Sequence, residues 1–390
     1  MLTREEIREL AEFRGEGADF AISFYFQPIL PSDKSHREET IQAKDLVRQA
    51  LREAEKDGRN GNVGGDLRRI LELAEKWKGT RARAKAVFAC SGRNIWREVD
   101  LPPLLAKSHL FVNRRFHLKE LAELMGSQPR LWVVFVDRHR ARFFDLHLDE
   151  VHEQEALFHA LPHRGRGDGF AGYDAGHAER SVNDEVLHHF KNVAEVLKLG
   201  VEREAFDRLV IGCQEIHWRE FEAHLHPYVK QRLLGRFAAE VGTVTKKLVR
   251  EQGERMVTES LAQHRHEQVE EVLSQARSNG RGVTGLRRVL RSLEMGEVQV
   301  LLMADNYSAH AVECTNCGHL DAHMVAYCSV CGRSTQELED VCEAIVPAAI
   351  RRDVELVYVK GEPEFENVGG IAALLRFRAD QKKGGVAAAS

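Results

Sequence analysis

The chain has 390 residues, of which 43% are hydrophobic and 30% are charged, and its 56 Lys and Arg against 60 Asp and Glu leave a net charge of −4. This apolar content excludes a disordered polypeptide, and the length exceeds the roughly 100–200 residues of one typical domain, so we expect two or three domains. The balanced charge argues against a uniformly basic nucleic-acid binder of the histone kind. No apolar run approaches the roughly 18 residues of a membrane-spanning helix. The first residues lack an apolar signal core, so we expect a cytoplasmic protein that meets no membrane.

The first part of the chain predicts a small α/β domain. Aromatic and β-branched residues favour a strand over 20–26, and apolar residues at helical spacing favour a helix over 35–56. A glycine-rich break follows, and Asp66 then has the character of an N-cap for a helix over 66–77. The remaining elements expected here are strands over 84–89 and 95–99 and a helix over 116–125.

The middle part alternates strands and helices, which is typical of an α/β domain. An apolar strand over 131–136 is followed by a turn that carries Arg138 and Arg140, and by a second strand over 142–146. A glycine-rich loop over 162–176 precedes the helical segment. The elements expected after the loop are helices over 179–199, 215–234 and 243–276 and a buried strand over 208–212.

The third part repeats this pattern around an insertion. A helix in 284–295 is expected to stop at Gly296 before a buried strand that ends at Met303. After the insertion we expect a helix over 336–351 and a strand over 354–359, and the pattern over 370–377 fits either a helix or a strand.

Charge is distributed unevenly among the three parts. With breaks near Gln128 and His266, the parts hold 23 basic against 20 acidic, 20 against 22 and 13 against 18 residues, which gives net charges of +3, −2 and −5. One end of the chain could therefore face nucleic acid while the other faces protein.

Four of the seven cysteines form a metal-binding pattern. Cys314, Cys317, Cys328 and Cys331 make two Cys-x-x-Cys pairs ten residues apart, and a glycine follows each pair. In a long chain without a secretion signal this spacing predicts zinc and not disulfides. Four thiolates close a tetrahedral Zn²⁺ site at about 2.3 Å, so the predicted zinc is structural. The alternative is four free thiols.

The third and middle parts resemble a known superfamily. The segment from Gly285 to Met303 (GLRRVLRSLEMGEVQVLLM), the four-cysteine insert and the segment from Asn367 to Phe377 (NVGGIAALLRF) resemble the C-terminal domain of the archaeo-eukaryotic class-one peptide release factors and Pelota. The segment from Val133 to Phe144 (VVFVDRHRARFF) resembles the strand pair that opens their middle domain, and the segment from His189 to Glu195 (HFKNVAE) resembles the helix after its catalytic loop. The matches occur in the family's order, and the chain is identified as a member of the bacterial branch, which includes ribosome-hibernation factors of the Balon type.

The resemblance implies three mixed α/β domains over residues 1–127, 128–265 and 266–390, the last one L7Ae-like with a small zinc-ribbon insert over 312–334. It implies a ribosome ligand about the size of tRNA that occupies the A site. The first domain would face the decoding centre and the middle domain the peptidyl-transferase centre. The third would face the stalk base and an elongation-factor-Tu-like GTPase. The expected partners are thus rRNA and protein, not DNA.

The middle part departs from the family at its catalytic loop. Release factors carry Gly-Gly-Gln at the tip, where the backbone and the glutamine help water to attack the peptidyl ester. Here the aligned stretch is Gly165-Arg-Gly167-Asp-Gly169-Phe-Ala-Gly172, and no glutamine occurs from Leu157 to Val196. The first domain also lacks a stop-codon motif of the Asn-Ile-Lys-Ser type. We therefore expect no enzyme.

Two groups of residues are candidates for contact with rRNA. In the glycine-rich loop, His163, Arg164 and Arg166 could meet phosphates while Gly165, Gly167 and Gly169 allow a close backbone approach. An ordinary surface loop is the alternative, and the dinucleotide-binding pattern that the glycines mimic lacks the required strand and helix. In the turn, Arg138, Arg140 and the following Arg142 could touch phosphate, although an exposed hairpin also needs such charges.

The sequence thus predicts a ribosome-binding homologue of release factors that acts by occupancy in hibernation, protection or rescue. Two other classes remain open. One is an enzyme, either a peptide release factor or peptidyl-tRNA hydrolase with a divergent loop, or a metal-dependent nuclease. The other is a zinc-containing adaptor that binds proteins away from the ribosome.

Overall fold

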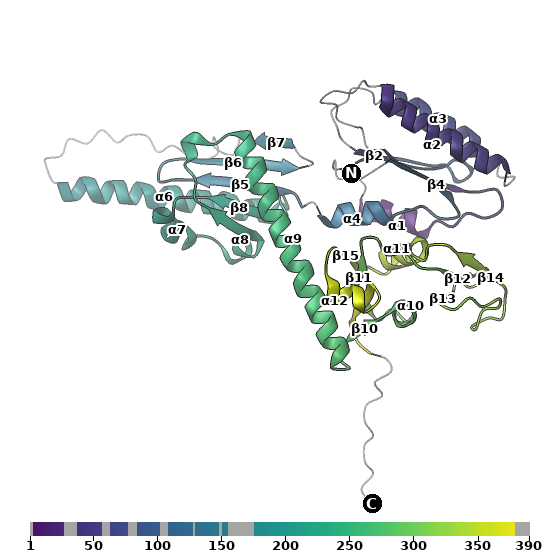
Figure 1. The fold of residues 1–390 in the computed structure, drawn as a ribbon. Helices are drawn as coiled ribbons and strands as arrows, with labels where there is room; N and C mark the ends of the chain where they lie inside the picture. The colour runs from purple at the N-terminus through teal and green to yellow at the C-terminus, as the bar shows by residue number, and fades with distance from the viewer. Residues whose placement is uncertain are drawn as a thin grey trace, which may run out of the picture. The chain divides into compact units, whose positions relative to one another are not determined.

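The computed structural model describes residues 3–26, 37–56, 63–76, 84–101, 108–127, 129–147, 150–154 and 175–378. The chain divides into two compact units, which we call unit 1 (residues 1–126 together with 263–390) and unit 2 (residues 127–262). Figure 1 shows sheets and helices in both units, and the mixed α/β class predicted from the sequence is confirmed. The first and third predicted domains share unit 1, and the boundaries at 127/128 and 265/266 stay predictions.

The N-terminal half of unit 1 is built on a four-stranded antiparallel sheet in the order β3-β2-β1-β4. Helices α2 and α3 cover one face of this sheet through an apolar core that includes Phe24, Val47 and Ile70. The elements are α1 (Arg4–Glu12), β1 (Ala21–Phe26), α2 (Arg37–Lys56), α3 (Val63–Lys76), β2 (Ala84–Cys90), β3 (Ile95–Leu101), β4 (His109–Asn113) and α4 (Lys119–Ser127).

Helix α1 begins with a capping box. The Thr3 hydroxyl accepts from the amide of Glu6 at 3.2 Å, and the Glu6 carboxylate accepts from the amide of Thr3 at 2.8 Å. Two donors of the first turn are thereby satisfied. The buried side chains of Ile7, Leu10 and Ala11 then form the face of α1 that joins the core shared with the C-terminal half.

The prediction for Asp66 is wrong. Helix α3 starts at Val63, and Asp66 lies inside it with 6% of its surface exposed. Its carboxylate accepts from the amide of Ser91 at 2.9 Å, so it fixes the turn between β2 and β3 instead of capping a helix. A short polar side chain such as that of Asp66 can either cap a helix or accept a hydrogen bond from a distant amide, and the sequence does not distinguish the two roles.

The C-terminal half of unit 1 contains a second four-stranded sheet in the order β10-β16-β11-β15, in which β11 and β15 are parallel. Its elements are β10 (Gly282–Thr284), α10 (Leu286–Glu294), β11 (Val298–Ala304), α11 (Cys342–Arg351), β15 (Glu355–Val359), α12 (Pro363–Asn367) and β16 (Ile371–Leu375). Helix α9 (Lys246–Arg277) packs on one face through Val269, Val272 and Leu273, and the other face joins α10, α11 and the N-terminal half in one core.

The cysteine insert, residues 311–338, separates β11 from α11. It forms its own small sheet in the order β13-β12-β14, with β12 (Ala311–Cys314), β13 (Leu320–Asp321) and β14 (Thr335–Leu338). The predicted helix over 336–351 is therefore wrong at its start, because residues 335–338 pair with β12 and the helix begins only at Cys342. The open choice over 370–377 is resolved in favour of a strand, β16.

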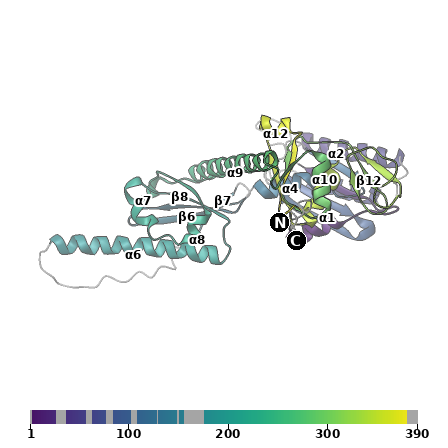
Figure 2. The same ribbon diagram turned by 90° about the horizontal axis from the view of Figure 1, so that it is seen from below.

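Unit 2 is a five-stranded sheet in the order β7-β6-β5-β8-β9, in which β5, β8 and β9 are parallel. Its elements are β5 (Leu131–Val136), β6 (Ala141–His147), β7 (Glu150–Glu153), α6 (Ala175–Glu202), β8 (Arg208–Gly212), α7 (Glu215–Glu222), α8 (Pro227–Arg232) and β9 (Leu233–Phe237). Helices α6, α7 and α8 pack on one face and the first half of α9 on the other. Figures 1 and 2 both show α6 reaching beyond the sheet at the edge where β5 ends.

The predicted helix over 215–234 is wrong in its second half. Helix α7 ends at Glu222, Pro227 starts the short helix α8, and Leu233–Phe237 form a parallel strand beside β8. A proline suits the first turn of a helix and breaks a longer one. Pairing with β8 is a long-range contact that periodicity alone does not reveal.

Gly253 lets α9 lie directly on the sheet of unit 2. A Cβ atom at this position would come within 2.8 Å of a Leu146 methyl group and 3.0 Å of a Leu131 methyl group. Any side chain here would push the helix away from the core. Within the described ranges, none of the helices, α9 included, is both long and apolar enough to cross a membrane.

Candidate zinc centre and candidate RNA interface

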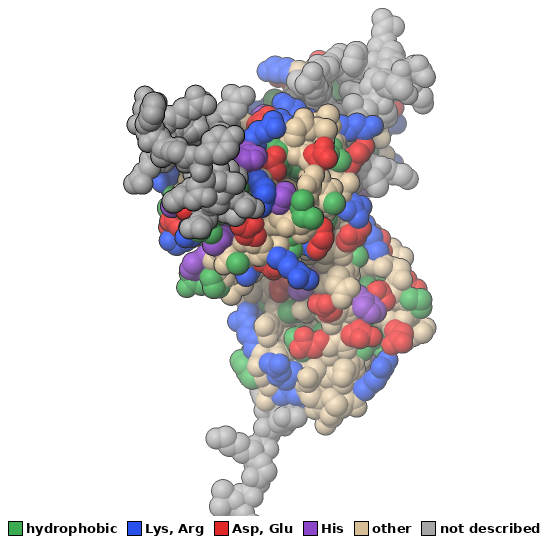
Figure 3. Space-filling model, turned by 90° about the vertical axis from the view of Figure 1, so that its left-hand side faces the viewer, with side chains coloured by type: hydrophobic (Ala, Val, Ile, Leu, Met, Phe, Trp, Pro, Cys, Tyr) green, Lys and Arg blue, Asp and Glu red, His purple; other side chains and the backbone are tan. Residues whose placement is uncertain are grey.

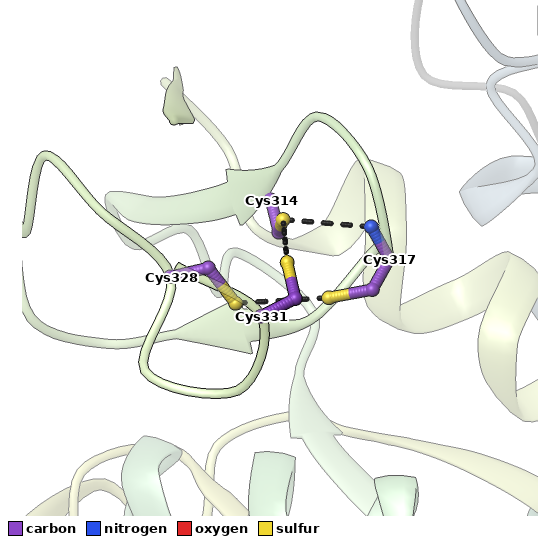
Figure 4. Close-up of side chains that lie close together, drawn as sticks. All are labelled: Cys314, Cys317, Cys328 and Cys331. Carbon is purple, nitrogen blue, oxygen red and sulfur yellow. Dashed lines mark hydrogen bonds between the residues drawn. The ribbon is translucent and has the colours of Figure 1, made fainter. Parts of the chain in front are cut away.

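The four cysteines of the predicted zinc site lie together in the cysteine insert. Their sulfur atoms are all within 4.8 Å of one another, with Sγ–Sγ distances of 3.4 Å for Cys314 and Cys331 and 3.6 Å for Cys317 and Cys328. Figure 4 shows all four side chains directed at a common centre. A Zn–S bond of about 2.3 Å in a tetrahedron requires sulfurs about 3.8 Å apart. The observed cluster matches that spacing.

The two Cys-x-x-Cys turns have the same backbone hydrogen bonds. We call them knuckles, residues 314–318 and 328–332. In the first knuckle the amide of Gly318 donates to the carbonyl of Cys314 at 3.1 Å, and in the second Gly332 donates to Cys328 at 2.9 Å. Both glycines have a positive φ, 72° and 71°, which a residue with a side chain adopts only with strain. The repeated geometry explains why each pair ends in glycine.

Backbone amides point at the sulfur atoms of Cys314 and Cys328. Cys317 and Asn316 each donate an amide to Cys314 Sγ at 3.4 Å, and Val330 donates to Cys328 Sγ at 3.3 Å. These bonds, that of Cys317 foremost, lower the pKa of the Cys314 thiol to about 6. Thiolates are the form that binds Zn²⁺. The donor set and its surroundings therefore fit a structural zinc ion held by four cysteines.

Two contacts fix the cysteine insert to the rest of unit 1. His319, after the first knuckle, has its Nδ1 2.7 Å from the Glu294 carboxylate at the end of α10. Glu313, directly before Cys314, is 1% exposed and forms a two-point ion pair with Arg115 of the N-terminal half. Arg14 reaches the same carboxylate at 3.5 Å. Sequence reasoning missed this carboxylate, since its partners lie about 200 and 300 positions away.

The loop residues proposed for rRNA contact, His163, Arg164, Gly165, Arg166, Gly167 and Gly169, lie outside the described residues. The other two, Arg138 and Arg140, lie in the turn between β5 and β6. Both are exposed, and neither forms an ion pair with another residue in the part of the chain that the structure describes. Their guanidinium groups are thus available to an anionic ligand.

A rigid turn presents these two arginines. The Asp137 carboxylate accepts from the amides of His139 and Arg140 at 2.8 and 2.7 Å, and the Asp137 amide donates to the Arg140 carbonyl at 2.9 Å. The turn lies at the carboxyl edge shared by the parallel strands β5, β8 and β9. In open α/β sheets this edge is the usual place for ligands. Figure 3, which looks onto this end of unit 2, shows histidines and basic side chains among carboxylates.

Arg142, the third arginine of the segment, is engaged inside the unit. Its guanidinium forms two bonds to the Glu153 carboxylate, at 2.6 and 2.9 Å, and one to the carbonyl of Val244 at 3.1 Å. The Glu153 carboxylate raises the pKa of Arg142 further. This side chain holds β6, β7 and the segment before α9 together, so it has a structural role.

Two histidines, His189 and His217, lie beside the turn that carries Arg138 and Arg140. The sequence did not indicate that either histidine contacts this turn. His189 of α6 lies against the backbone of Arg140 and Asp137, and burial lowers the pKa of its imidazole. His217 of α7 is half-buried, and burial, followed by the nearby Arg138 cation, lowers its pKa. Because both imidazoles favour the neutral form, they shape the site without adding fixed charge.

Comparison with known proteins finds similarity to release factors over the segment that contains these residues. Residues 117–256 match the model of bacterial archaeo-eukaryotic release factor family 10. The chain is 22% identical to peptide chain release factor subunit 1 of Pyrococcus abyssi, over 96% of this chain and 97% of that protein, and equally to that of Thermococcus kodakarensis over the same shares. The family model thus covers a middle segment of the chain, whereas the two archaeal release factors align over almost its whole length. A solved structure of S. cerevisiae Dom34, a translation termination-like factor, aligns with a TM-score of 0.40 and 8% identity, over 97% of this chain and 94% of that one.

The segment that matches the family model contains some of the candidate residues and not others. It begins at His117, includes every strand of unit 2 and ends within α9. Arg138, Arg140 and the loop over 162–176 therefore lie inside the matched segment, and the four cysteines lie outside it. The zinc assignment thus depends on the geometry of the cysteines alone.

Proposed function

We propose that this release-factor homologue is a cytoplasmic, ribosome-binding translation factor that occupies the A site without hydrolysing peptidyl-tRNA, in hibernation, protection or rescue. One observation carries the proposal. The segment that matches the bacterial release-factor family contains no glutamine from residue 157 to 196, where a hydrolytic factor needs one. The chain keeps the release-factor framework and lacks the group that aids attack by water.

A protein that acts by occupying the A site must bind the ribosome firmly, but it needs no catalytic group. Arg138 and Arg140 are exposed on a turn whose backbone is fixed by Asp137, so little conformational freedom is lost when they meet phosphates. Arginine forms two-point contacts to phosphate oxygens that depend on position and not on base identity. We propose that this turn and the loop over 162–176 bind rRNA together.

The same proposal gives roles to the cysteine insert and to the third part of the chain. Unit 1 holds the zinc ion, whose role is to stabilise the cysteine insert, because four thiolates leave no open coordination position for a substrate. The third part of the chain carries a net charge of −5, and we propose that it contacts protein, an elongation-factor-Tu-like GTPase among the candidates.

A release assay tests the proposal. Purified 70S ribosomes carrying labelled peptidyl-tRNA are incubated with excess protein, bound protein is measured by pelleting, and free peptide is measured in the same tubes. The proposal predicts bound protein and a release rate equal to that of buffer alone. Release above buffer by bound protein contradicts it and favours a hydrolase with a divergent loop. Absence from the pellet at low salt favours an adaptor that acts away from the ribosome.

A further inference from the structure

The tip of the cysteine insert carries three exposed apolar side chains. Met324 is 55% exposed, Tyr327 71% and Val330 69%, and all three lie within seven consecutive positions. We call this group the insert tip. The other large apolar side chains that are exposed in the described ranges are separated from one another along the chain. Clustered exposed apolar residues mark contact sites more often than scattered ones do.

The backbone beneath the insert tip is held firmly. Tyr327 pairs with Ser334 in a β-bridge, the amide of Thr335 donates to the carbonyl of Ala326 at 3.0 Å, and the amide of Val330 donates to Cys328 Sγ at 3.3 Å. These bonds fix the backbone that carries the three exposed side chains. A rigid apolar projection of this kind fits a pocket with little loss of entropy.

The charge around the insert tip selects the kind of partner. Residues 311–340 contain five carboxylates and one cation, Arg333. Glu313 is neutralised by Arg115 and Glu337 lies 3.5 Å from His310, while Glu337 and Glu339 are both exposed. A phosphate backbone would be repelled by this surface, whereas a basic protein surface would be attracted. An aromatic and two aliphatic anchors on an acidic insert are suited to a protein pocket.

We propose that the insert tip docks into an apolar pocket on a basic ribosomal protein, and that it does not contact rRNA. This proposal rests on ribosome binding as the proposed function. It assigns the insert tip and the acidic charge of the insert to protein recognition, and it leaves the contact with rRNA phosphates to unit 2.

Site-specific crosslinking identifies the partner. A photo-reactive phenylalanine analogue replaces Tyr327, and a matched control carries it at Met295, which is 52% exposed in the same unit but outside the insert. Both proteins are pelleted with 70S ribosomes and irradiated. We expect Tyr327 to crosslink to one ribosomal protein and Met295 to give no such product. A Tyr327 crosslink to rRNA, or the same products from both positions, overturns the docking proposal while the pelleted protein still supports the proposed function. Failure of both proteins to pellet overturns the two together.

The ribosome affinities of two variants distinguish a protein partner of the insert tip from an RNA partner. The triple change Met324→Ser, Tyr327→Ser, Val330→Ser should weaken ribosome binding at least about tenfold, because apolar anchors of this kind dominate interfaces. Zinc content of one ion per chain shows that the variant is folded, and Met295→Ser is the matched control. The double change Glu337→Lys, Glu339→Lys should also weaken binding to a basic protein. Tighter binding by the lysine variant, or unchanged binding by the triple variant, contradicts the proposal.

Discussion

Arg115 and Glu313, 198 positions apart in the sequence, form a two-point ion pair in which the Glu313 side chain is 2% exposed and the Arg115 side chain 14%. Glu313 precedes Cys314, the first of the four clustered cysteines, and Arg115 follows β4 of the N-terminal half. The pair therefore joins the cysteine insert to the other half of unit 1.

Removal of Arg115 should destabilise unit 1 strongly. The Arg115→Ala change leaves a buried carboxylate with only the longer contact to Arg14, and breaking such a pair costs about 3 kcal/mol in free energy of unfolding. Urea unfolding measures this loss. The matched control is Arg8→Ala, whose ion pair with Asp353 is exposed and contributes less than about 1 kcal/mol. Equal losses in the two variants would show that Glu313 does not depend on Arg115.

The purified protein should contain one zinc ion per chain. Removal of one ligand, as in Cys331→Ser, should abolish stoichiometric zinc, because a three-thiolate site lacks the fourth donor that closes the tetrahedron. Metal content by mass spectrometry and the colour change of a zinc indicator after thiol modification measure it. Cys342→Ala serves as the control, since this thiol lies 3.3 Å from the Tyr307 carbonyl and away from the cluster. Zinc retained at full level by Cys331→Ser would refute the four-cysteine site.

The pH dependence of stability should report His189. Burial lowers its pKa in the folded state below the ordinary value of 6.5, so the unfolded chain binds the proton first as the pH falls. The free energy of unfolding of unit 2 should thus be highest above pH 6.5 and should fall as the pH drops below it. His217, whose pKa is lowered as well, adds to the same trend.

The His189→Gln variant should show a smaller loss of stability over this pH range than the unchanged protein. Urea unfolding at several pH values, followed by the fluorescence of Trp132 and Trp218 with Trp77 and Trp96 replaced by Phe, measures unit 2. An identical pH profile in the variant and the unchanged protein would mean that His189 does not titrate differently on folding.

Replacement of Arg142 should lower the stability of unit 2, whereas replacement of Arg138 and Arg140 should leave the stability almost unchanged. Arg142→Ala removes two bonds to Glu153 and one to a backbone carbonyl, and should lower the free energy of unfolding by about 2 kcal/mol. The exposed Arg138→Ala, Arg140→Ala double variant should unfold within about 0.5 kcal/mol of the unchanged protein. Urea unfolding of both proteins tests this, and a large loss in the double variant would show that these arginines are structural.

The sequence predicted the features that depend on residues close to one another along the chain. The four-cysteine cluster follows from cysteines and glycines that lie within 19 positions, and the structure brings all four sulfurs together. The buried stripe of α6, which includes Val186, Phe190 and Val193, follows from helical spacing. Short-range patterns of this kind carry their own geometry.

The features that could not be predicted from the sequence depend on contacts between segments far apart along the chain. The first two residues of β9 were expected to be helical, because the pairing of this strand with β8 is visible only once both strands are placed. Asp66 was expected to cap a helix, but its partner is the amide of Ser91, 25 positions away. Likewise, nothing near Glu313 in the sequence indicates the two arginines that surround it.

Sedimentation with 70S ribosomes over a range of salt concentrations tests whether this chain is a ribosome ligand anchored through phosphates. We expect the protein to migrate with 70S particles at low salt and the logarithm of its affinity to fall linearly with the logarithm of salt concentration. The Arg138→Ala, Arg140→Ala variant should reduce that slope by about 2, one for each lost contact. A protein that stays at the top of the gradient at every salt concentration, or that binds with no salt dependence, would show that phosphate contacts do not anchor it to the ribosome.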